Sequence, residues 1–515
     1  MAYKHNRRIA PEVRQSQLTR RYFIKASLAA ATTIALGDSL LSLVGCGPAA
    51  PPATSNVAPP ATTPPVTTPP AATTPPVQKR FQIPPLLKNT SSDPTKVIFE
   101  LDAQKGQTAF LSGKNAATFG FNGSYLGPTV RVKKGQQVNM TVKNQLDEVI
   151  TTHWHGALVP GDADGGPYQT IAAGGVWNPQ FPIEQQAATL WYHAHAMGTT
   201  GEQVYKGLAG LFIIDDDVSA GLSIPKDYGI DDIPLIIQDK RFAADGSLLY
   251  MDKPDDNRGM QGDTILVNGF VNAALDVSTI KMRFRILNAS NARIYSFILS
   301  DNSKFTQIAS DNGFLEAPVV MDALRLSPGE RAEVIIDFSN HAVGDTVTLQ
   351  SRTNVALNIM DFSVVTKTAD TKAIPAKLTT INKIAESSAV KTRTFVMGGM
   401  GADSNINGLQ MNLKTGMDTI HETVNIGDTE IWSVTSAASG GMPHPFHAHG
   451  VHFQVLDING SPPPANLLGW KDTVLVDTAN TVRLIGTFKY AGIYMLHCHN
   501  LEHEDAGMML QYQSK

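Results

Sequence analysis

The sequence predicts an all-β protein made of several sandwich domains. Its 515 residues contain short runs rich in Val, Ile, Thr and Phe, separated by Gly, Asn, Asp and Pro, which is typical of strands joined by turns. No long stretch of the sequence has the apolar period of an amphipathic helix. The chain beyond residue 78 is long enough for two to four domains, and many short strands in a chain of this size favour sandwiches.

Three segments illustrate the strand pattern. Apolar residues alternate with polar ones in 130–132 and again in 138–142, with Lys-Lys-Gly at 133–135 between them. Alternation places the apolar side chains of a strand on one face. We expect these two runs to form a hairpin across the Lys-Lys-Gly turn. The run 331–338 predicts a further strand.

Residues 1–45 predict an export signal that ends at a cysteine. The basic start closes with Arg20-Arg21-Tyr22-Phe23-Ile24-Lys25, which resembles a twin-arginine signal. The apolar stretch 26–45 contains Thr and Asp38 and is too polar to predict a membrane span. Leu43-Val44-Gly45-Cys46 resembles a bacterial lipobox, so we expect cleavage before Cys46 and a lipid anchor on its thiol. The alternative is a simple signal peptide with an incidental cysteine.

Residues 46–84 predict an extended tether. Residues 47–78 carry no charge and hold 11 of the 31 prolines, mixed with Ala and Thr. This composition cannot build a core, and repeated Pro-Pro favours a polyproline conformation. The tether would hold the rest of the chain away from a membrane, in the cell envelope on the periplasmic or extracellular side. A Pro-rich recognition ligand is the alternative.

Charge and cysteine content narrow the function classes. The whole chain has a net charge of −4, and residues 1–45 contribute +5, which leaves −9 for the remainder. An acidic protein of this kind is a poor partner for nucleic acid. The chain has two cysteines, and with Cys46 lipidated the exported protein would fold without a disulfide and rely on its core.

Cys498 lies between His497 and His499. On a strand, the thiolate would point to one face and the two imidazoles to the other. A thiolate with imidazoles suits copper or zinc. His503 follows five residues later and Met508 ten, and one Cys, two His and a weak axial Met form the ligand set of a blue-copper site.

Three further His-x-His pairs complete the pattern, at 153–155, 193–195 and 447–449. Each pair would place both rings on one strand face. His444 has the opposite parity to His447 and so would face the thiolate site. Eight imidazoles remain for a second site, which exceeds the needs of one ion and suits a cluster of three coppers. Structural zinc is disfavoured, because the closed Cys/His spacing of zinc fingers is not found in the sequence.

These four segments resemble, in order, the copper motifs of the multicopper oxidases, the family of laccases, bilirubin oxidases and copper-efflux oxidases. The stretch from His497 to Met509 is similar to the bacterial three-domain members. The resemblance runs from about residue 95 to 515 and includes stretches without ligands, at 283–293 and 328–333. Some division-associated relatives keep the fold and have lost the ligands, but this chain has the full set.

The resemblance implies three cupredoxin-like Greek-key β-sandwich domains, at 85–218, 219–370 and 371–515. The first two motifs fall in the first domain and the last two in the third. The three-copper cluster would therefore lie between these two domains, and the blue (type 1) copper wholly within the third.

The resemblance also implies four copper ions with assigned ligands. The type 1 copper would be held by His444, Cys498, His503 and Met508, the type 2 copper by His153 and His447, one type 3 copper by His155, His193 and His499, and the other by His195, His449 and His497. Met509 competes for the axial position, but the family spacing selects Met508. A Met ligand argues against the highest-potential laccases, since the axial ligand tunes the potential. We expect His5, His341, His421 and His452 to be ordinary residues.

Two acids are candidates for proton transfer. Reduction of O2 to water needs four protons, and a buried carboxylate near the cluster can relay them. In similar oxidases acids at the motif positions of Asp164 and Glu504 serve this purpose. The alternative for Asp164 is a turn residue, because it precedes Gly165-Gly166.

The implied activity is one-electron oxidation of a small reducing substrate coupled to four-electron reduction of O2 to water, by a monomer. Phenols or aromatic amines are the expected substrates, and small residues at Ser439-Gly440-Gly441 would leave the type 1 edge open to them. The alternative is oxidation of Cu(I), because thioethers select Cu(I). Four methionines precede the third motif and a fifth lies beside His444: Met397, Met400, Met411, Met417 and Met442. Methionine is otherwise ordinary core filler. An alternative of another class is a non-enzymatic copper-binding envelope protein.

Overall fold

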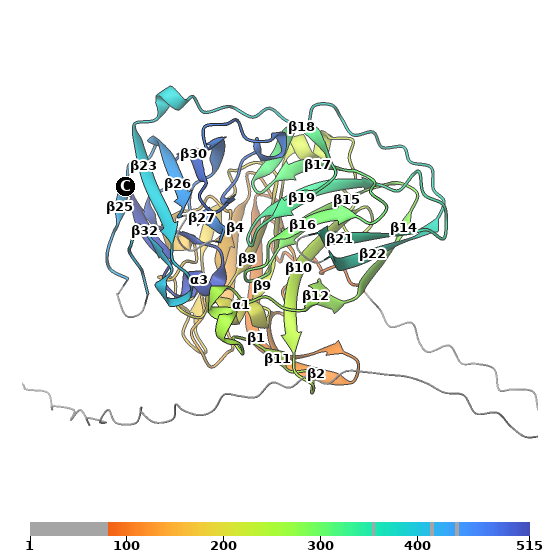
Figure 1. The fold of residues 1–515 in the computed structure, drawn as a ribbon, viewed down its shortest axis with the longest axis horizontal. Helices are drawn as coiled ribbons and strands as arrows, with labels where there is room; N and C mark the ends of the chain where they lie inside the picture. Colours follow the sequence, from red (N-terminus) through yellow and green to blue (C-terminus); the bar gives the residue numbers. More distant parts are fainter. Residues whose placement is uncertain (1–80, 353–355, 413–416, 438–441) are drawn as a thin grey trace, which may run out of the picture. The chain divides into compact units, whose positions relative to one another are not determined.

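The computed structural model describes residues 81–515, except 353–355, 413–416 and 438–441. The predicted export signal, Cys46 and nearly all of the tether lie outside the described residues, as do Ser439, Gly440 and Gly441. The described residues form six sheets, which pair around three cores in chain order (Figure 1).

The first two sheets enclose a core that includes Phe99, Val138, Phe181 and Phe212. One sheet has the order β2 (Lys114–Phe121), β1 (Lys96–Leu111), β4 (Gln137–Asn144) and β6 (Val176–Trp177), with β7 (Gln180–Pro182) also on β4. The other has the order β3 (Val130–Lys133), β9 (Ala209–Asp215), β8 (Ala188–His193) and β5 (His153–His155). Two of the histidine motifs therefore lie in this second sheet and at its ends.

The expected hairpin between 130–132 and 138–142 is wrong. β3 pairs in parallel with β9, and β4 pairs in parallel with β1, so the turn at 133–136 crosses from one sheet to the other. Gly135 has a φ of 91°, which suits glycine at this turn. Alternation identified the buried face correctly, because both strands contribute to the core between the sheets. It does not specify which neighbour a strand pairs with.

The second pair of sheets packs around Phe284, Phe297, Val334 and Phe362. The larger sheet has the order β13 (Phe270–Val271), β12 (Thr264–Val267), β10 (Asp232–Phe242), β15 (Lys281–Asn288), β20 (Arg331–Asp337), β17 (Phe305–Ser310) and β18 (Gly313–Met321), with β11 (Leu248–Leu249) on β10. The smaller has the order β14 (Ala273–Ser278), β22 (Ala356–Thr366), β21 (Thr346–Arg352), β16 (Tyr295–Leu299) and β19 (Leu324–Leu326). β20 confirms the strand predicted for 331–338.

The third pair of sheets encloses Phe395, Trp432, Phe446 and Leu496. One sheet has the order β24 (Asn405–Ile406), β23 (Lys391–Gly398), β26 (Thr429–Ser436), β30 (Thr481–Thr487) and β28 (Phe453–Ile458). The other has the order β25 (Glu422–Val424), β32 (Met509–Ser514), β31 (Gly492–Cys498), β27 (His444–Ala448) and β29 (Thr473–Val476). β27 and β31 are neighbours and carry the other two histidine motifs.

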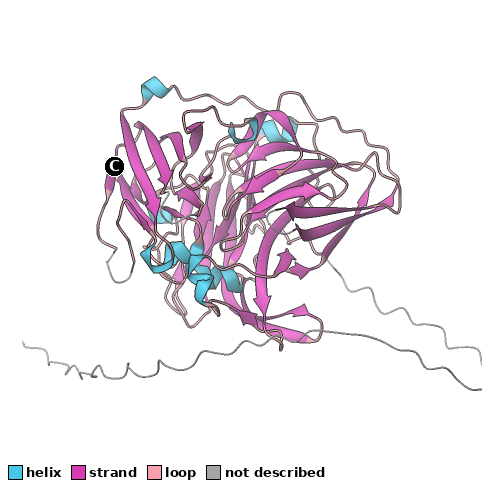
Figure 2. Ribbon diagram, in the orientation of Figure 1, coloured by secondary structure: helices cyan, strands magenta, loops and turns pink. Residues whose placement is uncertain are grey.

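Helices are few and short in the described part of the chain (Figure 2). They are α1 (Thr200–Lys206), α2 (Asp217–Gly221), α3 (Leu501–Asp505) and the 3-10 turns η1 (Gly161–Ala163), η2 (Pro254–Arg258), η3 (Glu386–Ser388), η4 (Gly401–Asp403) and η5 (Ala465–Leu467). α3 directly follows the His-Cys-His triplet, and the side chain of Asn500 caps its N-terminus by accepting from the backbone N–H of His503. Within the described ranges, no helix is long and apolar enough to cross a membrane.

The fold is thus mostly β, and its six sheets are consistent with three cupredoxin-like sandwich domains. This confirms the predicted fold class. The domain boundaries at residues 218 and 370 stay predictions.

Candidate copper centres

The four histidine pairs begin on two pairs of neighbouring strands. β5 pairs with β8 so that His153 lies opposite His193, and β27 pairs with β31 so that His447 lies opposite His497. Only the first His-x-His pair lies wholly within a strand. In the other three pairs the second histidine lies one or two residues beyond the end of its strand. Simple strand alternation therefore does not place it, and the expectation that all four pairs lie on strand faces is wrong.

The structure nevertheless brings the eight histidines together from two domains. Their ring nitrogens form three groups in which all ligand atoms lie within 4.8 Å of one another: His155, His193 and His499; His195, His449 and His497; and His153, His155 and His447. The first two groups are the predicted type 3 sets, and the third contains both predicted type 2 ligands. All eight side chains are buried, so the cluster lies inside the protein.

The predicted type 1 residues form a separate group in the third domain. The sulfur of Cys498 lies 3.6 Å from Nδ1 of His444 and 3.8 Å from Nδ1 of His503. Met508 is buried in the same core as Cys498, and its carbonyl accepts from the Cys498 N–H at 3.0 Å. Met509 packs instead in another cluster with Met495, which agrees with Met508 as the axial residue.

The donor atoms fit bound copper. Nε2 of His153, His193 and His447, Nδ1 of His155 and both nitrogens of His499 have no hydrogen-bond partner among the described residues, although they are buried. Buried polar groups without partners are costly and rare, so these nitrogens fit metal coordination. Burial lowers the pKa of His497 to about 3 and that of His444 to about 4, which keeps both rings neutral as ligands must be.

Cys498 needs a cation to ionise. Burial raises the pKa of its thiol far above the ordinary value, so the thiolate that binds a soft metal would not form at neutral pH unless a metal replaced the proton. The thiol, two neutral imidazoles and a buried thioether therefore suit copper better than an isolated redox cysteine.

Asp164 is a buried residue between two histidines from different domains. Its carbonyl accepts from Nδ1 of His153 at 2.9 Å, and its carboxylate Oδ2 lies 2.8 Å from Nδ1 of His449. The other carboxylate oxygen has no hydrogen-bond partner in the described structure. Such contacts fix the tautomer and orientation of ligating imidazoles. The turn interpretation is also partly right, because Asp164 directly ends η1.

Glu504 contacts the other two histidines of the type 3 set that contains His449. Its Oε1 is 3.4 Å from Nδ1 of His195, and its Oε2 is 3.2 Å from Nδ1 of His497. Burial raises the pKa of this carboxyl, while His195 partly offsets the effect. A buried carboxyl with a raised pKa, beside a site that consumes protons, is suited to carry one.

Sequence reasoning missed Asp472 as a residue at this site. Its Oδ1 lies 3.0 Å from Nε2 of His155, and its carbonyl accepts from Nδ1 of His447 at 2.9 Å. Although burial raises the pKa of Asp472, the charges of Arg331 and His155 lower it well below the usual range. The sequence does contain one indication of its role, because Lys471 and Asp472 directly precede the apolar strand β29. Charged residues at the start of a buried strand need buried partners.

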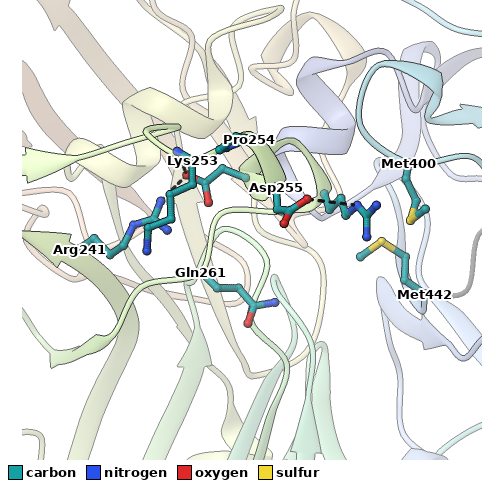
Figure 3. Close-up of a pocket in the computed structure, with 10 residues that line it drawn as sticks. Arg241, Lys253, Pro254, Asp255, Gln261, Met400 and Met442 are labelled. Carbon is teal, nitrogen blue, oxygen red and sulfur yellow. Dashed lines mark hydrogen bonds and ion pairs between the residues drawn. The ribbon is translucent and has the colours of Figure 1, made fainter. Parts of the chain in front are cut away.

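A cavity of about 710 Å³, whose lining is drawn in Figure 3, has residues in its wall that neighbour the type 1 group along the chain or through hydrogen bonds. Met442, two residues before His444, forms part of its wall together with Met400. Arg258 also lines it, and the Arg258 carbonyl accepts from Nδ2 of Asn500 at 3.1 Å. Asn500 caps α3, which carries His503, so hydrogen bonds join this part of the cavity wall to His503, while Met442 is joined to His444 through the chain.

Comparison with known proteins places the chain in a family. Three family models described as multicopper oxidase match residues 102–219, 242–362 and 374–515. The chain is 39% identical to the multicopper oxidase mco of Staphylococcus haemolyticus over 416 residues, which are 80% of this chain and 87% of the relative.

Solved structures agree with this relationship. The laccase of Pediococcus acidilactici superposes with a TM-score of 0.81 at 36% identity, covering 86% of this chain and 94% of that one. A bacterial laccase-like multicopper oxidase of Ochrobactrum sp., described as having oxidase activity towards lignin model compounds and lignosulfonate, has a TM-score of 0.78 at 37% identity, covering 84% and 100%.

Sandwich domains with eight clustered histidines and a separate group of one cysteine and two histidines are typical of a copper oxidase. The chain belongs to the multicopper oxidase family and is a laccase-like oxidoreductase. The family implies O2 and a reducing substrate as its reaction partners, and the histidine groups are consistent with type 1, type 2 and type 3 copper sites.

Proposed function

We propose that this protein oxidises phenols or aromatic amines one electron at a time at a type 1 copper and reduces O2 to water at a three-copper site. The cavity beside the type 1 residues carries this proposal. Its volume, about 710 Å³, is that of a site for a small organic molecule. The Ochrobactrum relative, described as acting on lignin model compounds, supports an aromatic substrate.

The arrangement of the proposed ligands suits substrate oxidation at one copper site and oxygen reduction at another. Bound copper would supply one-electron chemistry at the type 1 site and oxygen reduction at the other. Cys498 is covalently joined to His497 and His499, so its backbone links the type 1 group to both type 3 groups. The complete burial of the eight histidines keeps bulk water away from the oxygen site.

Two carboxyl groups would have different tasks at the oxygen site. Glu504, whose pKa is raised by burial, would hold a proton beside His195 and His497 and release it as oxygen is reduced. Asp164 would hold His449 and His153 in place through its carboxylate and carbonyl. We therefore assign proton transfer first to Glu504, and imidazole orientation together with proton transfer to Asp164.

Oxidation of Cu(I) is the second candidate, and Met400 and Met442 favour it. Both thioethers lie at one end of the cavity, away from Arg241 and Lys253 (Figure 3). Thioethers are preferred by Cu(I). The other three candidate methionines do not line the cavity. Met397 and Met411 are buried in cores, and Met417 packs beside Met411. Two candidate substrate ligands therefore line the cavity, and the other three methionines pack elsewhere.

Oxygen uptake by the copper-loaded protein tests the choice of substrate. We expect faster uptake with a methoxyphenol than with Cu(I) as the sole reductant. The variant Met400→Leu/Met442→Leu should then retain most phenol oxidation, because leucine preserves the apolar wall. Faster uptake with Cu(I), abolished in that variant, would instead identify copper detoxification as the function.

A non-enzymatic copper-binding envelope protein is the alternative of another class. It would not need a filled three-copper site, so a protein that binds four copper ions per chain and consumes O2 excludes it. We further propose that the protein is a monomer, exported by the twin-arginine route and anchored to a membrane through lipid on Cys46. Mass spectrometry of the membrane fraction, before and after Cys46→Ala, would detect or exclude that lipid.

A further inference from the structure

We propose that Arg331 and Asp472 are positioning residues for the three-copper site, and that the second domain, which supplies none of the proposed ligands, orients the histidines through them. The inference rests on the proposed copper assignment. It also explains why the stretch 328–333 accompanies the copper motifs although it contains no metal ligand.

Arg331 joins all three domains from a fully buried position at the start of β20. Its Nη1 and Nη2 donate to the two carboxylate oxygens of Asp472 at 2.8 and 2.6 Å, in the third domain. Its Nε donates to the carbonyl of Thr189 at 3.0 Å, on β8 of the first domain. The remaining donors reach the carbonyls of Gly329 and Asp311. All five N–H groups are thus used, and a bidentate pair of this kind fixes geometry as well as charge.

Asp472, held in place by Arg331, in turn contacts two proposed copper ligands, His155 and His447. The oxygen that accepts from Nη1 of Arg331 also lies 3.0 Å from Nε2 of His155, while the Asp472 carbonyl accepts from Nδ1 of His447. The hydroxyl of Thr473 donates to the same carboxylate at 2.7 Å. The rings of His155 and His447 stack with centroids 3.7 Å apart. Each ring therefore has one nitrogen held by Asp472 and one free for metal.

The charge of the surrounding network fits a nearby cation. Asp311 and Lys471 form a fully buried ion pair at 2.9 Å, and Lys471 also contacts Glu330 at 3.1 Å. Together with Arg331 and Asp472, these residues comprise three acids and two bases. A buried excess of negative charge is costly unless it is compensated. Copper held by the adjoining imidazoles would compensate it.

Copper binding distinguishes a positioning role of Arg331 and Asp472 from a purely structural one. A residue that only fastens the domains would change stability while leaving copper affinity and the copper spectra unchanged. A residue that orients ligands through a neighbouring carboxylate typically changes metal affinity by roughly 10- to 100-fold. The type 1 group shares no hydrogen bond with Arg331 or Asp472 in the described structure, so it provides an internal reference.

Copper titration of the copper-free full chain tests the inference. In Arg331→Lys, which keeps the charge but cannot donate a bidentate pair, the affinity of the three-copper site for copper should fall by roughly 10- to 100-fold. The electron paramagnetic resonance signal of the type 2 copper should also change. The blue absorption of the type 1 copper should saturate as in the wild type.

Arg325→Lys is the matched control. Arg325 also forms a bidentate pair across the second and third domains, with Asp477 at 2.7 Å for both bonds, but within the described ranges neither residue shares a hydrogen bond or an ion pair with a proposed ligand. This variant should bind copper like the wild type. A loss of three-copper affinity equal to that of Arg331→Lys would overturn the inference, because any weakened domain contact would then suffice.

If Arg331→Lys does not fold, Asp472→Asn tests the same inference. The asparagine preserves the shape of the side chain and removes its charge. Reduced copper affinity at the three-copper site with a normal type 1 signal supports the inference. Wild-type affinity and an unchanged type 2 signal overturn it. A wild-type protein that binds no copper at the eight histidines would instead contradict the proposed function itself, which keeps the two failures apart.

Discussion

The two proposed copper sites differ in how their residues are gathered. The type 1 group comes from the third domain alone, and three of its four residues lie between Cys498 and Met508. The three-copper group draws four histidines from the first domain and four from the third, and it contacts Asp164, Glu504 and Asp472. A local site can be preserved within one sandwich, whereas the composite site depends on how the domains are held together.

The supporting contacts follow the same division. Cys498 and Met508 are joined by a backbone hydrogen bond, and Asn500 caps the helix that carries His503. The three-copper group depends on side-chain contacts between distant segments, such as Asp164 to His449 and Arg331 to Asp472. We therefore expect a substitution at one site to change the copper signals of that site and to leave those of the other site unchanged.

Replacing Cys498 with Ser should have the largest effect. Because a hydroxyl is a poor ligand for copper, the type 1 copper and the blue colour should be lost, and oxygen uptake should fall to background. The type 2 resonance signal should remain, since the other histidines are unchanged. Metal analysis should find three coppers per chain, and a chain that loses all four would show that the sites are not independent.

Asp164→Ala should show the opposite pattern. It removes the carboxylate contact to His449, and loss of a residue with orienting and proton-transfer roles should slow turnover by roughly 100-fold or more. The blue absorption should be unchanged, because Asp164 shares no hydrogen bond or ion pair with the type 1 group in the described part of the chain. Unchanged oxygen consumption by this variant would remove Asp164 from the proposed reaction.

Met508→Leu should tune the type 1 site without emptying it. Removal of a weak axial ligand is expected to raise the reduction potential of the blue copper, which a redox titration would measure. The control is Met509→Leu, since Met509 packs in the cluster with Met495 rather than with Cys498. Equal potentials in the two variants would contradict the assignment of Met508.

His452→Gln should have the smallest effect, a change in how the stability of the copper-free protein depends on pH. The buried His452 lies 2.8 Å from the carbonyl of Gly156, and burial lowers its pKa from 6.5 to about 4. Between these values the unfolded chain binds a proton that the folded chain does not, so His452 reduces stability as pH falls. The linkage predicts a loss of about 2 kcal/mol between pH 7 and pH 5.

Denaturant unfolding at the two pH values would measure this loss. Glutamine can still donate to the Gly156 carbonyl but does not titrate, so the variant should lose less stability than the wild type over the same range. Identical pH dependence in both proteins would show that His452 does not contribute.

The sequence predicted the type 1 group more completely than the composite site. His444, Cys498, His503 and Met508 follow from strand parity and spacing together with the family resemblance, because their positions are local. The eight histidines also followed from the motifs, and the structure gathers them. Arg331 and Asp472 did not follow, because their pairing joins residues 141 positions apart, and spacing along the chain carries no information about such contacts.

The failed hairpin at 133–135 has a related cause. Alternation gave the buried faces of β3 and β4 correctly, but their pairing partners, β9 and β1, are set by the arrangement of whole sheets. His195, His449 and His499 likewise lie just beyond strand ends, where local backbone geometry replaces the simple period of a strand.

The number of electrons that the copper-loaded protein delivers to each O2 molecule distinguishes reduction to water from reduction to hydrogen peroxide. With a methoxyphenol as the sole reductant, we expect four one-electron oxidations per O2 consumed and no hydrogen peroxide. Two oxidations per O2 with release of peroxide would contradict a three-copper site that completes the reduction to water.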